Sequence, residues 1–414
     1  MAITTTWRVE IGSIASPTNF TTRVMGMSIN QSVDVNVIGR GTCVITLLNK
    51  DGALTPGGGG TYSTTDWFAQ GVYVTATTAS SVSVFHGVIT DFALADDGVF
   101  STVTITAQDG LSVAARTLGS TIQSSASYSS YYSSLVDRYG IVFPRLGQTN
   151  AEGEVTSEYP FTQPTVGLAA LQPAIFPTTY ADSLQQYLIP SVNDVTWATD
   201  TYISSSVTKY RIISLGSTNT RSTANQKTFE FVPTASIGTT QLPFDDNNFV
   251  QGFNNDTLIN QAQIKASFTG ATAQTVTNST NTSYGNRTVQ FTSTLNLSDT
   301  ESAATATLLT NRYSTSRFTP VQLSLTASMV KKYCADTSET AWRSLLAIDS
   351  GLWQRTKITW TGSGASSQTA YCVIKGRRID VTPQDTRITL MLGNWADNHS
   401  FILDTDQLDV DRLG

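Results

Sequence analysis

The stretch Ser101-Thr102-Val103-Thr104-Ile105-Thr106-Ala107 decides the fold class, because apolar and hydroxyl side chains alternate in it almost without a break. A period of two in mostly β-branched residues predicts a strand with one buried and one exposed face. Similar alternation occurs at 7–11, 33–37 and 42–47 and returns between 258 and 296. Glycine-rich turn signals separate these segments. The chain is therefore expected to be mainly β.

A hairpin pattern occurs near both ends of the chain. Near the front, segment 85–92 begins with an aromatic residue and is followed by a turn and the alternating run 101–107. Near the back, 371–379 also begins with an aromatic residue and precedes a turn and a second alternating run, 386–392. Similar segments in the same order are what an internal duplication leaves. The pattern favours two hairpins in equivalent positions.

Helix signals are confined to the middle and the later part of the chain. Segments 135–140 and 180–188 have helical character and, with the strand pattern at 210–213, suggest a small α+β domain. Ser298-Asp299-Thr300-Glu301 is a capping box ahead of an alanine-rich helix pattern. A second box, at 336–339, precedes three large apolar residues at helical spacing.

Length and composition limit the function classes. The chain has 414 residues, of which 40% are apolar, so more than one domain is expected. Only 14% of the residues are charged, and the net charge of −6, with 8 Lys against 17 Arg, argues against a surface that grips nucleic acid. The sequence contains no run of 18 consecutive apolar residues, so no membrane-spanning helix is expected. Residues 1–6 do not resemble a secretory signal.

The cysteines and histidines are too few and too scattered to predict a metal site or a disulfide framework. Cys43, Cys334 and Cys372 lie among apolar neighbours and are interpreted as small core residues. His86 and His399 are the only histidines, and the chain contains no Gly-x-Ser-x-Gly nucleophile motif. A histidine-based active site is therefore not expected.

Paired acidic residues are the remaining candidates for catalysis or calcium binding. They are Asp96-Asp97, Glu152/Glu154, Asp245-Asp246 and the tail segment 404–411. Two carboxylates can hydrolyse a glycoside and several can hold calcium, but here they lie in turn-like sequence without a recognised spacing. The glycine-rich run 56–60 lacks the Lys-Ser/Thr of a phosphate loop. We therefore predict no catalytic, cofactor-binding or metal-binding residue.

Four tryptophans gather in the last quarter of the chain: Trp342, Trp353, Trp360 and Trp395. Exposed indole rings would suit stacking on sugars, whereas buried rings would fill the core of a β domain. Core packing is the favoured interpretation, and glycan binding stays open as the alternative.

Three stretches together resemble the minor tail or hub proteins of long-tailed bacteriophages, particularly those of actinobacteria. The first is 85–111, with Phe85-His86-Gly87-Val88-Ile89-Thr90-Asp91 followed by Val103-Thr104-Ile105-Thr106-Ala107-Gln108-Asp109-Gly110-Leu111. The second runs from Phe244-Asp245-Asp246 to Asn311-Arg312-Tyr313. The third joins Leu345-Leu346-Ala347-Ile348-Asp349-Ser350-Gly351 to Phe401-Ile402-Leu403-Asp404 and the ending Arg412-Leu413-Gly414. Leu352-Trp353 departs from the family pattern, and nothing in 117–240 resembles it.

The resemblance implies a mainly β fold with small α+β insertions, built on two tail-tube-like β-barrel domains as in the baseplate hub of contractile tails. The implied boundaries are a first barrel at 1–116, a small α+β domain at 117–200, a second barrel at 201–244 and 318–400, an inserted domain with a helix at 245–317, and a C-terminal tail at 401–414.

The resemblance also implies a structural, non-enzymatic role in the virion, for a protein made in the host cytoplasm. Three copies would form a pseudo-sixfold ring that joins the tail tube to the tip. The implied partners are a distal tail or tube ring, the tape-measure protein, tip or fibre proteins, and DNA that passes through the lumen without specific binding. The alternatives are a glycan-binding adhesin and a tail-associated glycan hydrolase.

Overall fold

The structure is a computed structural model in which part of the chain is described. The described residues are 3–13, 16–32, 41–96, 101–109, 122–123, 174–175, 197–204, 207–214, 229–234, 237–238, 240–253, 258–280, 282, 285–294, 296, 298–314, 318–347, 355–361 and 367–394. The expected strand at 33–37, the expected helices at 135–140 and 180–188, and the tail at 401–414 lie outside them.

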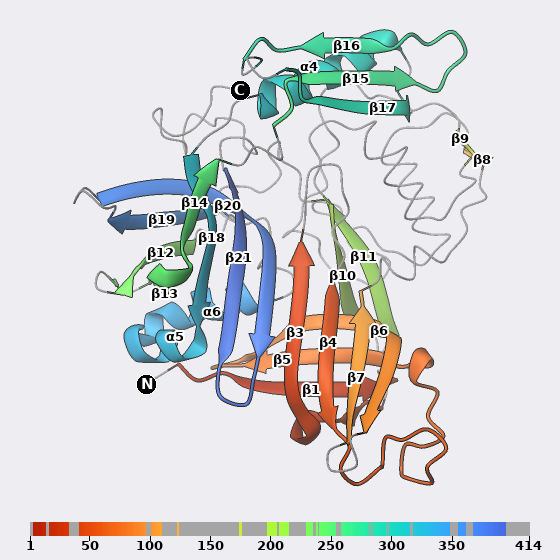
Figure 1. The fold of residues 1–414 in the computed structure, drawn as a ribbon, viewed down its shortest axis with the longest axis vertical. Helices are drawn as coiled ribbons and strands as arrows, with labels where there is room; N and C mark the ends of the chain where they lie inside the picture. Colours follow the sequence, from red (N-terminus) through yellow and green to blue (C-terminus); the bar gives the residue numbers. More distant parts are fainter. Residues whose placement is uncertain are drawn as a thin grey trace.

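The front half of the chain contributes seven strands to one large sheet. They are β1 (Thr6–Gly12), β2 (Thr18–Asn19), β3 (Val24–Ser32), β4 (Thr42–Leu48), β5 (Gly71–Thr77), β6 (Ser81–Asp96) and β7 (Ser101–Gln108). Their order across the sheet is β3-β4-β7-β6-β5-β1-β2. In Figure 1, β3, β4 and β7 stand side by side, while β5 and β1 run across them, so the sheet curves strongly.

The back half contributes seven more strands to the same sheet. They are β12 (Phe229–Pro233), β13 (Leu242–Phe244), β14 (Val250–Phe253), β18 (Phe318–Thr326), β19 (Arg355–Thr361), β20 (Ser367–Val381) and β21 (Thr386–Asn394). Their order, β14-β18-β21-β20-β19-β12-β13, repeats that of the front half when each set is numbered along the chain. One detail differs, because β12 runs parallel to both of its neighbours whereas β1 runs antiparallel to both.

The repeated strand order bears out the duplication expected from the sequence. The two predicted hairpins are β6–β7 and β20–β21, and they occupy the same place in their halves. Helices α5 (Ala327–Tyr333) and α6 (Glu339–Leu346) follow β18, where the front half has a long loop after β4. The predicted fold class, mainly β, is confirmed.

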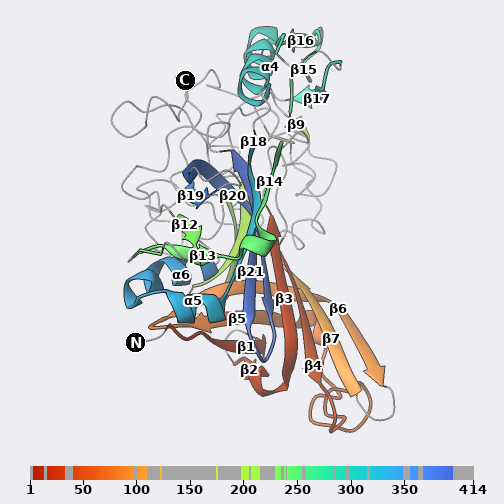
Figure 2. The same ribbon diagram turned by 60° about the vertical axis from the view of Figure 1, so that its left-hand side comes forward.

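Smaller elements lie outside the large sheet. Strands β15 (Gln261–Ala266), β16 (Gln274–Thr277) and β17 (Thr288–Thr294) form a sheet packed on helix α4 (Asp299–Tyr313), at one end of the molecule (Figures 1 and 2). Strands β10 (Trp197–Ser204) and β11 (Val207–Ser214) form a separate hairpin, as do the short β8 (Ile122–Gln123) and β9 (Ala174–Ile175). The domain boundaries expected from the sequence stay a prediction, although β14 lies within 245–317 and pairs with β18 of the large sheet.

One hydrophobic core serves both halves. Its central row crosses the large sheet from strand to strand as Leu325, Ile388, Ile379, Ile29 and Cys43, all fully buried. Burying a branched aliphatic side chain of this size contributes about 1.5–3 kcal/mol. Because the row passes from β20 to β3 without a break, the two halves are stabilised together.

The predicted helix starts have different outcomes. The Ser298 hydroxyl accepts a hydrogen bond from the Glu301 N–H at 3.2 Å, so the first capping box caps α4 as expected. At the second box, residues 336–338 form a 3₁₀ turn, and α6 begins at Glu339 without a side-chain cap. The reason is that the Ser338 hydroxyl donates to the Gln241 carbonyl at 2.9 Å instead. No helix in the described part of the chain is long and apolar enough to cross a membrane.

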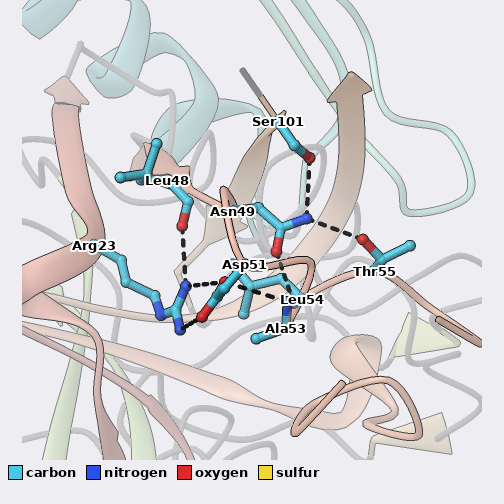
Figure 3. A network of polar contacts seen from close by, with 8 residues as sticks. All are labelled: Arg23, Leu48, Asn49, Asp51, Ala53, Leu54, Thr55 and Ser101. Atoms are coloured by element: carbon cyan, nitrogen blue, oxygen red, sulfur yellow. Dashed lines mark hydrogen bonds and ion pairs between the residues drawn. The ribbon is translucent and has the colours of Figure 1, made fainter. Parts of the chain in front are cut away.

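The long loop after β4 is held rigidly at its base (Figure 3). Arg23 donates to both carboxylate oxygens of Asp51, at 2.8 and 2.6 Å, and to the Leu48 carbonyl at 3.3 Å. The buried Asn49 amide donates to Thr55 and Ser101 at 3.0 and 3.1 Å and accepts from the Leu54 N–H at 2.8 Å. The Arg23 guanidinium holds the pKa of the Asp51 carboxyl well below its usual range.

Candidate functional site

The two β-hairpins match residue by residue. A constant shift of 285 residues converts the β6–β7 pairing into the β20–β21 pairing, so that Val88 corresponds to Val373 and Asp96 to Val381. The register break between Ile89 and Asp91 falls at the position equivalent to the break between Ile374 and Gly376. Each residue of one hairpin can therefore be compared with the equivalent residue of the other.

The two halves are joined by a strand pair between β3 and β20. Residues 376–381 of β20 pair antiparallel with residues 27–32 of β3, with Ile379 opposite Ile29. Residues 367–373 of β20 pair with β19 along the same edge, because β21 occupies the other edge. The register break in β20 marks the point at which its partner changes from β19 to β3. We call the β3–β20 pair the seam.

A buried arginine lies at the centre of the seam. Arg377 is fully buried, although arginine is rarely buried unless it is paired. Its guanidinium donates to the Gln31 side-chain oxygen on β3 and to the Leu345 and Ala347 carbonyls at the end of α6, the last at 2.9 Å. The arginine therefore connects β20 and α6 of the back half with β3 of the front half.

Further polar contacts cross between the halves. The Trp7 indole donates to the Thr386 hydroxyl at 2.9 Å, and the Trp342 indole donates to the Thr5 hydroxyl at 2.9 Å. Glu339 accepts from the Thr78 hydroxyl. Each contact joins one group from the front half to one from the back half, so side chains outside the seam also hold the two halves together.

The face of the large sheet opposite the core is polar. Cross-strand pairing places two rows on it. Thr389, Arg378, Asn30 and Thr42 form one, which ends at the buried Ser324. Thr326, Arg387, Asp380, Ser28, Val44 and Thr106 form the next. Arg378 makes an ion pair with Asp380 at 3.0 Å, and Ser28 donates to the same carboxylate at 2.7 Å. The face thus carries mainly hydroxyl and amide groups, and its two rows contain two arginines, Arg378 and Arg387, and one carboxylate, that of Asp380.

The three cysteines predicted as core residues are buried to different extents. Cys43 and Cys372 are fully buried, and burial raises the pKa of both thiols, that of Cys372 to about 12. Cys334 is half-buried, and burial raises its pKa as well. His86 is buried in the front half, with its ring 5.6 Å from that of Tyr73. His399 lies outside the described residues.

The acidic candidates are only partly described. Asp245 accepts from the Asn247 N–H at 3.1 Å and from the Asn248 amide at 2.5 Å, which is the role of a turn residue, as interpreted from the sequence. Asp96 ends β6, whereas Asp97, Glu152, Glu154 and the tail segment 404–411 lie outside the described residues. In the described part of the chain, no group of three or more His, Cys, Asp or Glu residues could hold a metal ion.

Two of the four tryptophans of the last quarter are described. Trp342 is fully buried and Trp360 nearly so, which confirms core packing for these two. Trp353 and Trp395 lie outside the described residues.

Two solved structures share the fold of almost the whole chain. The 43 kDa tail protein of prophage MuSo2 from Shewanella oneidensis is 11% identical, with a TM-score of 0.54, and the match covers 95% of this chain and 99% of that one. A tail protein from Neisseria meningitidis MC58 is 10% identical, with a TM-score of 0.55 and the same coverage. No family model and no curated protein sequence matches the chain. The resemblance to phage tail proteins is therefore confirmed at the level of the fold.

Proposed function

We propose that this chain is a structural protein of a phage virion and forms the central hub of the tail tip or baseplate. In this role, three copies form a ring in which six related β domains surround a channel. The ring joins the sixfold tail tube to the threefold tip, and the protein works by assembly and not by catalysis.

The observation that carries the proposal is the duplication of one strand order in two halves joined edge to edge. Two equivalent domains per chain give six in a trimer, so a threefold assembly presents an approximately sixfold surface. The fold shared with two phage tail proteins supports the same assignment. A chain with one such domain would need six copies for the same ring.

The polar face of the large sheet is the candidate wall of the channel. Hydroxyl and amide groups dominate its rows, and Asp380 neutralises Arg378 locally, which leaves Arg387 as the one cation of the two rows outside that ion pair. A wall of this kind offers phosphates few unpaired cations, so DNA would pass without sticking to it. The partners implied by this role are a distal tail or tube ring, the tape-measure protein, and tip or fibre proteins.

Native mass spectrometry of the purified protein tests the proposal, followed by electron microscopy of the oligomer. We expect a mass near three times 44.5 kDa and particles with threefold symmetry and a central opening. A protein that stays monomeric at all concentrations, or that forms a hexamer, contradicts the threefold hub.

A further inference from the structure

The seam inside the chain is a template for the contact between chains. We propose that residues 91–96 of β6 in one copy pair antiparallel with β14 of a second copy, and that this pair repeats the β3–β20 pairing. The inference rests on the proposed function, because a closed ring of three copies requires a head-to-tail contact between each copy and the next.

The first half of the argument is an open strand edge on β6. Residues 376–381 of β20 have a neighbour on both edges, β21 on one and β3 on the other. The equivalent residues of β6, 91–96, pair with β7 on one edge, and among the described residues no strand pairs with the other edge. Hairpin β10–β11 lies near β6 but forms a separate sheet.

The exposed fractions of two equivalent side chains also indicate an open edge on β6. Leu94 is the residue equivalent to Ile379 under the shift of 285. Ile379, which lies opposite Ile29 of β3, is 0% exposed, whereas Leu94, which has no such neighbour among the described strands, is 40% exposed. An apolar side chain that is open in the single chain, at a position buried in its internal counterpart, indicates a missing neighbour.

The second half of the argument is the matching open edge on β14. In the strand order, β14 takes the place of β3, and β18 takes that of β4. β3 pairs with β4 on one edge and with β20 on the other, whereas β14 pairs only with β18 among the described strands. Its first residue, Val250, is 45% exposed. One copy therefore offers both edges of the contact, at opposite ends of its large sheet.

The internal seam also predicts the register. Val44 of β4 and Gln322 of β18 are equivalent, because they pair with Thr106 and Met391, which the shift of 285 relates; two residues before them, Thr42 corresponds to Pro320. The pairing of β14 with β18 shifts register between Val250 and Gln251, so the comparison starts at Gln251. Asn30 pairs with Thr42, and Gln251 pairs with Pro320, so Gln251 takes the place of Asn30. Because Asn30 lies opposite Arg378, Gln251 should lie opposite Ala93, the residue equivalent to Arg378.

Cysteine cross-linking tests this register directly. The variant A93C/Q251C also carries C334S, which removes the half-buried native thiol. It is oxidised with diamide at a protein concentration at which native mass spectrometry detects the oligomer. We expect covalently linked dimers and trimers on a non-reducing gel, since facing residues of an antiparallel pair are close enough for a disulfide. The single variants A93C and Q251C should remain unlinked.

The matched control is N30C/R378C, which places the same pair of cysteines across the internal seam. It should form a bond within one chain and leave the mass unchanged. If this control forms its bond and the oligomer is a trimer, but A93C/Q251C does not link the copies, the β6–β14 contact is wrong while the hub proposal stands. If no trimer forms at any concentration, both are overturned.

A substitution gives an independent measurement. L94K places a charge on the β6 edge that the contact would bury, so the dissociation constant of the trimer should rise about tenfold or more. Tyr333 has the same 40% exposure and lies on helix α5, outside both strands of the proposed contact, so Y333K should leave the trimer intact. Equal effects of the two variants, or none from L94K, would overturn the contact.

Discussion

The buried guanidinium at the seam gives the most direct test of how the two halves are held together. Replacing Arg377 by Met keeps the length of the side chain and removes its hydrogen bonds to Gln31 and to the carbonyls of Leu345 and Ala347. Each buried acceptor left without a partner costs about 1–3 kcal/mol. Removing the cost of burying a charge offsets part of this loss. We expect R377M to lower the free energy of unfolding by about 3 kcal/mol.

The assay is equilibrium unfolding in urea, followed by tryptophan fluorescence and far-UV circular dichroism. Arg378 provides the matched control, because it is the next residue on β20, faces the polar side of the sheet and makes an exposed ion pair with Asp380. R378M should cost about 0.5 kcal/mol or less. An unfolding free energy for R377M within about 0.5 kcal/mol of the parent, or an equal loss in both variants, would refute the reasoning.

A double-mutant cycle separates the arginine–glutamine bond from the rest. Q31L removes the acceptor on β3, and the cycle of R377M with Q31L measures how far the two side chains stabilise each other. We expect a coupling of about 1 kcal/mol or more, since the residues are in direct contact. Additive effects would mean that the arginine acts only through the two carbonyls of the α6 end.

Three other predictions concern the loop, the helix cap and the thiols. D51N should lower the melting temperature near neutral pH, and the gap from the parent should narrow below about pH 4, because a carboxyl with a lowered pKa loses its stabilisation as it becomes protonated. A gap independent of pH contradicts this. S298A removes the cap of α4 and should cost about 1 kcal/mol in urea unfolding, whereas S298D should cost much less. Iodoacetamide should label only Cys334 in the native protein, because Cys43 and Cys372 are inaccessible to the reagent and burial raises the pKa of their thiols. Mass spectrometry of the treated protein measures which thiols are modified. Rapid labelling of either buried thiol would contradict the described core.

The sequence predicted those parts of the fold that depend on neighbours along the chain. The alternation at 101–107 became β7, and the related run at 386–392 became most of β21. The two strands and the turn of a hairpin are continuous in the sequence, so a duplicated hairpin appears there as a repeated pattern. The cap at Ser298 could be predicted for the same reason, because a helix start is determined within four residues.

Contacts between distant residues could not be predicted in this way. Arg377 and Arg378 are adjacent charged residues in one strand. The alternation puts Arg377 in phase with the apolar Ile379 and Val381, but the sequence does not indicate which groups would accept hydrogen bonds from a guanidinium on that face. The partner of Arg377 is decided by the pairing of β20 with β3, whose residues lie about 350 positions earlier in the chain. The period of a strand gives two alternating faces but not the neighbour that covers each, so only the tertiary structure could place Arg377 against Gln31. The sequence by itself thus determined the strands and their duplication, and the tertiary structure decided which edges meet and which stay open, because pairing depends on packing between residues that are not neighbours along the chain.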